Sequence, residues 1–75
     1  MQITQEQIDA LKKFGYHWRE DVREFWHEDH DDKNAILPFT YQQEWQLRSQ
    51  GWTNDEWEWD YETFSSFEKL LEYLT

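Results

Sequence analysis

The sequence from residue 52 to residue 62 is WTNDEWEWDYE, and this stretch sets the first expectation for the fold. From Glu56 to Glu62 acidic residues alternate with aromatic ones, which is the period of two that predicts a half-buried strand. Asn54 and Asp55, just before it, are residues that favour a tight turn. The stretch therefore predicts a β-hairpin whose last strand turns its rings towards the core and its carboxylates towards solvent.

The N-terminal region predicts a helix over residues 3–15. Thr4 is a good N-cap residue, and Gln7 stands where a capping box needs it. Apolar residues then recur at helical spacing as far as Phe14. Gly15 follows, and glycine commonly ends a helix because it tolerates the left-handed conformation.

A similar pattern returns about 36 residues later in the chain. The matches are Thr4-x-x-Gln7 with Thr40-x-x-Gln43, and Leu11-Lys12-x-x-Gly15 with Leu47-Arg48-x-x-Gly51. Internal repeats decide a fold where they occur. The match predicts a second helix over residues 41–50 and a repeat that relates residues 3–28 to residues 39–62.

The remaining segments are assigned from local signals. Residues 16–28 fit a hairpin or a helix, and the repeat favours the hairpin. Residues 28–37 read as an Asp-rich connecting loop that ends at Pro38. Ser65 with Glu68 resembles another capping box, before a helix with Leu at helical spacing.

Together these elements predict a small two-layer α+β domain. Its order is helix–hairpin–helix–hairpin–helix, with the helices on one face of a short antiparallel sheet. The 75 residues are enough for one domain, acidic and rich in aromatic residues, which we expect to span residues 1–75. Aromatic residues make up 20% of the chain, and large rings help so short a chain to build a core.

Acidic residues dominate the charge and restrict the partners. The chain carries 17 Asp and Glu against 7 Lys and Arg, a formal net charge of −10. Such a surface disfavours direct binding to nucleic acid, so the expected partner is a protein with a basic surface. The acids cluster in two segments, and the predicted partner-binding residues are Glu28, Asp29, Asp31, Asp32, Glu56, Glu58, Asp60 and Glu62.

The carboxylates of residues 56–62 have two interpretations. They protect an exposed strand edge from pairing with other chains, or they form a binding stripe for a basic surface. An interface that did not depend on salt would instead point to an aromatic patch, for which we consider Trp18, Trp26 or Trp45 as the anchor.

Histidine and carboxylate residues between His27 and Asp32 resemble metal ligands only weakly. His27 and His30 are the candidates, but their spacing matches neither a metalloprotease motif nor a calcium loop, so we predict no metal. The sequence shows no catalytic signature and no cofactor fingerprint. We therefore expect a protein that is not an enzyme and has no cofactor.

The sequence favours a small acidic protein-interaction module, a regulator or an adaptor that docks on a basic site of a larger protein. One alternative is an inhibitor that imitates nucleic acid, as small anti-restriction, anti-CRISPR or nuclease-immunity proteins do; a second is a metal-binding protein that uses the His27–Asp32 loop. The absence of cysteine and of an apolar N-terminal segment predicts a cytoplasmic protein without a membrane span. The charge favours a monomer or a weak homodimer.

Overall fold

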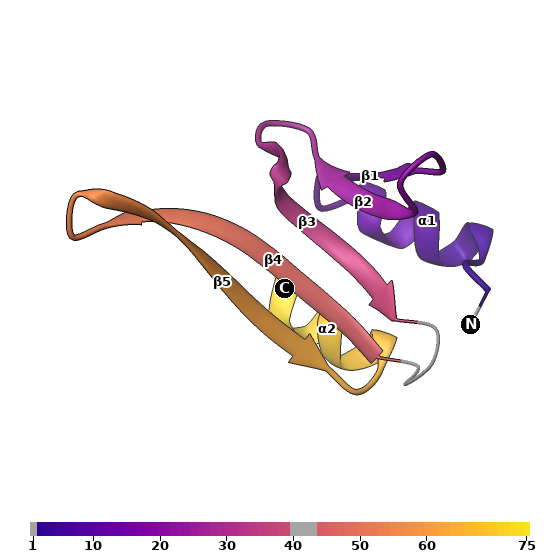
Figure 1. The fold of residues 1–75 in the computed structure, drawn as a ribbon. Helices are drawn as coiled ribbons and strands as arrows, with labels where there is room; N and C mark the ends of the chain where they lie inside the picture. Colours follow the sequence, from indigo (N-terminus) through magenta and orange to yellow (C-terminus); the bar gives the residue numbers. More distant parts are fainter. Residues whose placement is uncertain (1, 40–43) are drawn as a thin grey trace.

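A five-stranded antiparallel sheet makes up most of the structure, a computed structural model that describes residues 2–39 and 44–75 (Figure 1). The order of the strands in the sheet is the order in the chain, so each strand pairs with the next. The elements are α1 (Gln5–Lys12), β1 (Tyr16–Arg19), β2 (Glu24–His27), β3 (Asp31–Phe39), β4 (Glu44–Thr53), β5 (Glu56–Phe64) and α2 (Phe67–Leu74).

The predicted N-terminal helix is confirmed, and its capping box is present. Thr4 is extended and its side chain accepts a hydrogen bond from the Gln7 backbone N–H, while the Gln7 side chain accepts one from the Thr4 backbone N–H. These two bonds satisfy N–H groups that have no partner inside the helix. Leu11 is the residue that α1 buries, and Gly15 follows with a positive φ of 88°.

Residues 16–28 form a hairpin, although the sequence of this segment is also compatible with a helix. β1 and β2 pair from Tyr16 opposite His27 to Arg19 opposite Glu24. Arg23, in the connection between them, has a positive φ of 54°, which a helix would not contain. Phe25 is fully buried, whereas its neighbours Glu24 and Trp26 are half-buried, which is the alternation of a strand.

The predicted second helix over residues 41–50 is wrong for every residue of it that the structure describes. Residues 44–50 belong to β4, whereas residues 41–43 and the Thr40–Gln43 cap lie outside the described residues. Trp45 and Leu47 are buried and the residues between them are not, which is the alternation of a strand. Pairing with strands on both sides overrides a weak local helix preference.

The predicted internal repeat and the predicted helix–hairpin–helix–hairpin–helix arrangement are also wrong, because both depend on that helix. Residues 3–15 contain a helix, whereas their counterparts after residue 44 are strand. Gly51, matched to Gly15, lies inside β4, and Gly15 itself lies beyond α1, which ends at Lys12 with Lys13 as its C-cap. The class remains a small α+β fold, but one built from a single sheet and two short helices.

The predicted loop over residues 28–37 is also wrong, because β3 begins at Asp31. Ala35 and Ile36 are fully buried in the middle of the sheet, where β3 pairs with both β2 and β4. Pro38 lies beyond Ile36, the last β3 residue paired with β2. Proline is tolerated there because one side of the strand is free of ladder bonds.

Both helices cover the same face of the sheet, behind the strands in Figure 1. One core cluster joins Leu11 of α1 and Leu70 of α2 to buried residues of four strands, namely Tyr16, Phe25, Ile36, Trp45 and Leu47. α1 contacts β1, and α2 contacts β4 and β5. Ser66, rather than the predicted Ser65, caps α2 by accepting a hydrogen bond from the Lys69 backbone N–H at 3.2 Å.

The β4–β5 hairpin extends beyond the rest of the sheet (Figure 1). β3 pairs with β4 from Phe39–Glu44 only as far as Asn34–Ser49, whereas β4 and β5 continue to pair as far as Thr53 opposite Glu56. Residues 50–59 therefore form a two-stranded ribbon, and we call them the ribbon below. A two-stranded hairpin gains little stability alone, so the ribbon depends on its continuity with the sheet.

We expect opposite effects from replacing the two glycines. A Cβ atom added at Gly51 meets no atom within 4 Å, so Gly51→Thr should raise the free energy of unfolding by up to about 1 kcal/mol. A Cβ atom at Gly15 would lie 3.0 Å from His27 Nε2 at a positive φ, so Gly15→Ala should lower it by about 1–3 kcal/mol. Urea unfolding followed by circular dichroism measures both, and a Gly51→Thr loss as large as that of Gly15→Ala would contradict the strand position.

Candidate functional site

The tip of the ribbon fixes the register of the candidate site. Asn54 and Asp55 have φ values of 51° and 64°. Two consecutive positive φ angles define the mirror-image turn that suits the twist of a hairpin, and Asn and Asp accept this conformation more readily than most residues. The predicted turn is confirmed, and it places Thr53 opposite Glu56 at the start of the ladder.

Trp57, Trp59 and Tyr61 of β5 lie on the face of the sheet away from the helices, which we call the open face, and this corrects the prediction that these rings face the core. Leu47 and Trp45 point into the core, and their partners on β5 are Glu62 and Phe64. Residues directly opposite each other share a face, so the even-numbered residues of β5 lie on the helix side. Trp57, Trp59 and Tyr61 must then lie on the open face.

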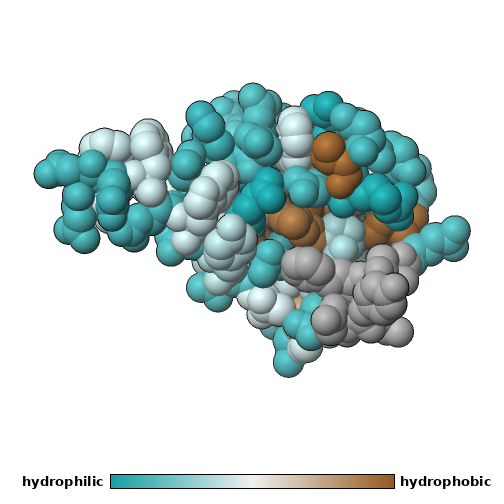
Figure 2. All heavy atoms as spheres, viewed as in Figure 1, coloured by the Kyte–Doolittle hydropathy of each residue, from teal (hydrophilic) through white to brown (hydrophobic). Residues whose placement is uncertain are grey.

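These residues form an exposed row with a neighbour from β4. We call Trp52, Trp57, Trp59 and Tyr61 the aromatic row; their exposed fractions are 57%, 60%, 44% and 55%. Trp52 and Trp57 are paired across the ribbon and meet edge to face, with ring centroids 5.2 Å apart. Figure 2, in the same view as Figure 1, shows pale side chains of intermediate hydropathy over this hairpin among hydrophilic ones.

The carboxylates of β5 form a second row on the opposite face. We call Glu56, Glu58, Asp60 and Glu62 the acidic row; all four residues are exposed. Thr53, Gly51, Ser49 and Leu47 stand opposite them on β4. The acidic row therefore lies on the helix side, but it continues along the ribbon past the part of the sheet that the core supports.

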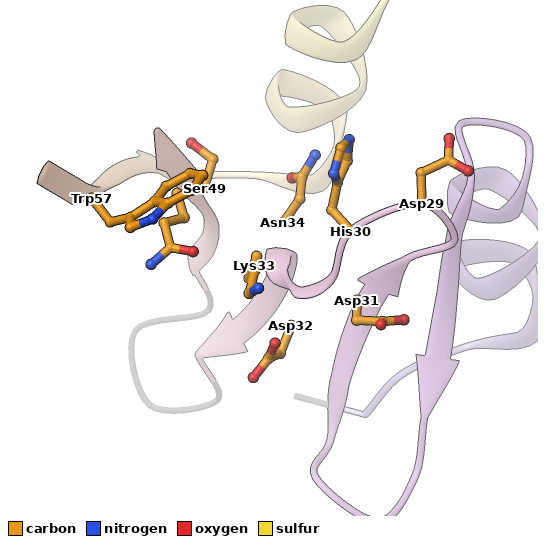
Figure 3. Close-up of a pocket in the computed structure, with 9 residues that line it drawn as sticks. Asp29, His30, Asp31, Asp32, Lys33, Asn34, Ser49 and Trp57 are labelled. Atoms are coloured by element: carbon orange, nitrogen blue, oxygen red, sulfur yellow. The ribbon is translucent and has the colours of Figure 1, made fainter. Parts of the chain in front are cut away.

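Three of the other predicted binding residues, Asp29, Asp31 and Asp32, line a cleft beside the ribbon. Glu28 and Asp29 lie in the turn after β2, and Asp31 and Asp32 begin β3. Asp29, Asp31 and Asp32 line a cleft of about 610 Å³ together with Trp57 (Figure 3). Its remaining lining residues are His30, Lys33, Asn34, Ser49 and Gln50.

The cleft exists because β3 stops pairing with β4 at Asn34–Ser49, whereas β4 continues along β5 as far as Thr53. Beyond Asn34–Ser49 the described residues of β3 no longer pair with β4, so the turn before β3 and the ribbon stand apart. Three acids of the first segment and one ring of the aromatic row thus line the same cleft. Glu28 does not line the cleft, and its Oε2 atom lies 3.2 Å from His17 Nε2.

The three tryptophans considered as anchors are not the exposed ones. Trp45 is 1% exposed and belongs to the core, where its ring centroid lies 4.9 Å from that of Phe67. Trp18 and Trp26 are half-buried. Phe64 is the signal in the sequence that could have identified the exposed rings. In the alternation of β5 it falls on the same face as the acidic residues, so an apolar Phe64 in the core places Trp57, Trp59 and Tyr61 on the exposed face.

Arg48 connects the aromatic row to the centre of the open face. Its Nη2 atom donates to Glu24 Oε1 at 3.2 Å and to the Asp32 carbonyl at 2.8 Å, and its guanidinium carbon lies 5.4 Å from the Trp59 ring centroid. Glu24 Oε1 also accepts from Trp26 Nε1 at 2.9 Å. This largely buried ion pair holds β2 and β4 in place across β3.

The histidine candidates do not gather ligands for a metal. The His27 and His30 rings stack with centroids 5.3 Å apart, and His27 Nδ1 accepts a hydrogen bond from the Asp29 backbone N–H. In the part of the chain that the structure describes, His, Asp and Glu side chains nowhere form a group of three that could hold a metal ion.

Among the residues that the structure describes, the pKa values of Tyr16 and Asp21 are shifted, and both residues lie away from the ribbon. The hydrogen bonds from Arg19, whose Nη2 lies 3.0 Å from Asp21 Oδ2, lower the pKa of the Asp21 carboxyl. Burial raises the pKa of Tyr16, whose hydroxyl donates to Asn34 Oδ1 at 3.0 Å. At neutral pH Tyr16 is thus an uncharged donor that links β1 to β3.

Comparison with known proteins assigns the chain to no family. No protein-family model matches it, and neither the curated proteins nor the solved structures give a match. Within residues 2–39 and 44–75, neither helix is long and apolar enough to cross a membrane. The candidate site therefore rests on the residues and the geometry of this chain alone.

Proposed function

We propose that the protein is a binding module whose β4–β5 hairpin docks on a basic, partly apolar surface of another protein. The observation that carries the proposal is the aromatic row, four half-exposed rings of which three lie on the ribbon that projects beyond the core and the fourth, Tyr61, lies next to it. Rings buried in the core stabilise the fold, whereas rings held outside it contribute little to folding. Their position is explained most simply by contact with a partner.

The size of the aromatic row supports this proposal. A buried Trp or Tyr ring removes roughly 150–250 Å² from water, so four half-exposed rings leave on the order of 300–500 Å² available. Patches of that size on a monomer are often functional. Trp and Tyr are also the residues that most often supply binding energy at interfaces.

Charge supports a basic partner. The acidic row and the three aspartates of the cleft lie on either side of the ribbon, within a chain of net charge −10. An acidic surface accelerates association with a basic partner and makes the affinity fall as salt rises. The rings supply the part of the affinity that salt does not screen.

The arrangement of the acids gives no support to imitation of nucleic acid. Phosphates recur about every 3.4 Å along a DNA strand, whereas carboxylates on one side of a strand recur about every 6.7 Å. A second acidic strand beside β5 would be needed to approach that density. β4 instead places Thr53, Gly51 and Ser49 next to the acidic row.

The test is affinity capture from cell extract at low salt, followed by a salt gradient. The variant E56Q/E58Q/D60N/E62Q removes the acidic row, and the control E6Q/D9N/E68Q/E72Q removes the same charge from exposed positions on the two helices. We expect a basic protein to bind the wild type and the control, and the acidic-row variant to bind it about ten times more weakly or worse.

The contrary result is equally specific. If the affinity for the captured protein were unchanged between low salt and about 0.5 M salt, where charges are screened within a few Å, the acidic row would not be part of the interface. Equal weakening by the acidic-row variant and by the control would show that net charge matters and the ribbon does not.

A further inference from the structure

We propose that the free edge of β5 binds an extended basic peptide segment of the partner as a sixth strand. Alternate side chains of that segment would lie on the two rows: apolar ones against the aromatic row and basic ones against the acidic row. The inference rests on the proposed function and specifies how the partner is recognised.

The free edge is long and regular. β5 is the last strand in the sheet order, so within the described residues it pairs on one side only, with β4 (Figure 1). Its register with β4 runs without a shift from Thr53–Glu56 to Trp45–Phe64. The opposite edge of the sheet, β1, has four residues, which offers a peptide much less backbone.

The turn identifies which backbone groups of β5 point outward. A two-residue turn closes on a hydrogen-bonded pair, here Thr53 and Glu56, and such pairs alternate along an antiparallel ladder. The groups of Glu58 and Asp60 therefore point towards β4, and those of Trp57, Trp59 and Tyr61 point towards the free edge. An added strand would bond to the residues that carry the rings.

The side chains beside this edge match the period of a strand. Residues on one face of a strand are about 6.7 Å apart, and an added strand has the same repeat. Directly opposite side chains have Cβ atoms about 4.5–5.5 Å apart, so each carboxylate of Glu56, Glu58, Asp60 and Glu62 could meet one Lys or Arg. Backbone bonds give affinity in such complexes and the alternate side chains give specificity.

A second copy of this chain does not suit the same edge. Two β5 edges that met would bring acidic rows face to face, and each chain carries a net charge of −10. The carboxylates thus repel copies of the protein and attract a basic segment. The two interpretations of these residues, edge protection and a binding stripe, describe one property of the edge.

The test uses a synthetic nine-residue peptide that alternates Lys with Val, capped at both ends. It is compared with a peptide of the same composition in which Lys and Val form two blocks. At about 20 mM salt we expect the alternating peptide to bind at least ten times more tightly, measured by fluorescence anisotropy of a labelled peptide. Equal affinities would overturn strand addition, because only the alternating peptide can place all its charges on one face.

N-methylation of the peptide backbone tests the hydrogen bonds themselves. In an antiparallel arrangement the Val residues share the face of the rings and bond to β5, so methylation at two central Val residues should weaken binding at least tenfold, and methylation at two central Lys residues by less than about threefold. The reverse selectivity would indicate a parallel strand and would equally support the proposal. Equal effects of the two methylations would overturn it.

Hydrogen exchange locates the peptide on the protein. We expect the amides of Trp57, Trp59 and Tyr61 to exchange rapidly in the free protein and to slow at least tenfold when the peptide is bound. Slowing at Gln50 and Trp52 instead would place the peptide on the cleft side of the ribbon and overturn the assignment to β5.

The two proposals fail in different ways. If the peptide bound with an affinity that fell in E56Q/E58Q/D60N/E62Q but did not respond to N-methylation, strand addition would be wrong and the proposed function would stand. If none of the peptides bound at 1 mM, strand addition would be overturned, and the proposed function would fall only if the capture experiment also failed.

Discussion

Replacing Trp45 by alanine should lower the free energy of unfolding by about 3–5 kcal/mol, the usual range for a buried Trp or Phe. The side chain is 1% exposed, and its ring lies 4.9 Å from Phe67 and 6.2 Å from Phe25 by centroids. It is one of the largest fully buried side chains and joins α2 to the sheet. A domain of this length has only about 4–11 kcal/mol of stability in total, so the variant should lose a large share of it.

Urea unfolding followed by far-ultraviolet circular dichroism measures this effect without relying on tryptophan fluorescence. Trp45→Phe keeps a ring in the same place and should cost less than Trp45→Ala, which provides a folded variant for comparison. Trp52→Ala removes an equally large side chain that is 57% exposed, and it should cost no more than about 1 kcal/mol. Similar losses for Trp45→Ala and Trp52→Ala would contradict the placement of Trp45 in the core.

Local signals were sufficient for the elements that depend on few residues. The capping box of Thr4 and Gln7 is present, and the turn at Asn54 and Asp55 has the conformation expected of it. The alternation after Glu56 is a strand. In each of these cases the deciding interaction lies within a few residues, so the sequence alone carries the information.

The β4 strand shows where local signals fail. A cap, a leucine and a glycine resembled those of α1, but β4 is held on both sides by β3 and β5, and that pairing could not be read from the segment itself. Trp45 and Leu47 already showed a period of two. The resemblance to residues 3–15 outweighed it, although helix preference is weak evidence beside tertiary contacts.

The candidate site was predicted in part. The alternation from Glu56 to Glu62 is a strand as predicted, but Asp31 and Asp32 begin β3 rather than lie in the predicted loop, and the two faces of β5 were exchanged. Rings were assigned to the core because they are apolar, a rule that holds for most small domains. The register with Leu47 and Trp45 decides the matter, and register is a property of two strands rather than one.

The aromatic row should carry more of the binding energy than any other part of the surface. We expect the double variant Trp57→Ala/Trp59→Ala to weaken binding to the captured partner about 100-fold or more, because buried Trp at interfaces often contributes 2 kcal/mol or more each. The same variant should lose only about 1–2 kcal/mol of folding stability. It removes the edge-to-face contact between Trp57 and Trp52 and the cation–π contact between Trp59 and Arg48.

A matched control separates the ribbon from exposed apolar surface in general. Val22 and Tyr73 are 43% and 58% exposed and lie outside the ribbon, in the β1–β2 turn and on α2. The variant Val22→Ala/Tyr73→Ala should therefore bind the partner within about twofold of the wild type. Isothermal titration with the purified partner, together with urea unfolding of each variant, gives the two quantities needed.

Combining the ring and acid variants then tests whether one partner segment contacts both faces of β5. The free-energy losses of distant, independent contacts add, whereas groups that hold the same element show a coupling of about 0.5–3 kcal/mol. An added strand is fixed by both rows at once, since its backbone lies between them, so loss of one row should loosen its contact with the other. We expect Trp57→Ala/Trp59→Ala and E56Q/E58Q/D60N/E62Q together to cost less than the sum of the two, and strict additivity would indicate separate contacts on the two faces.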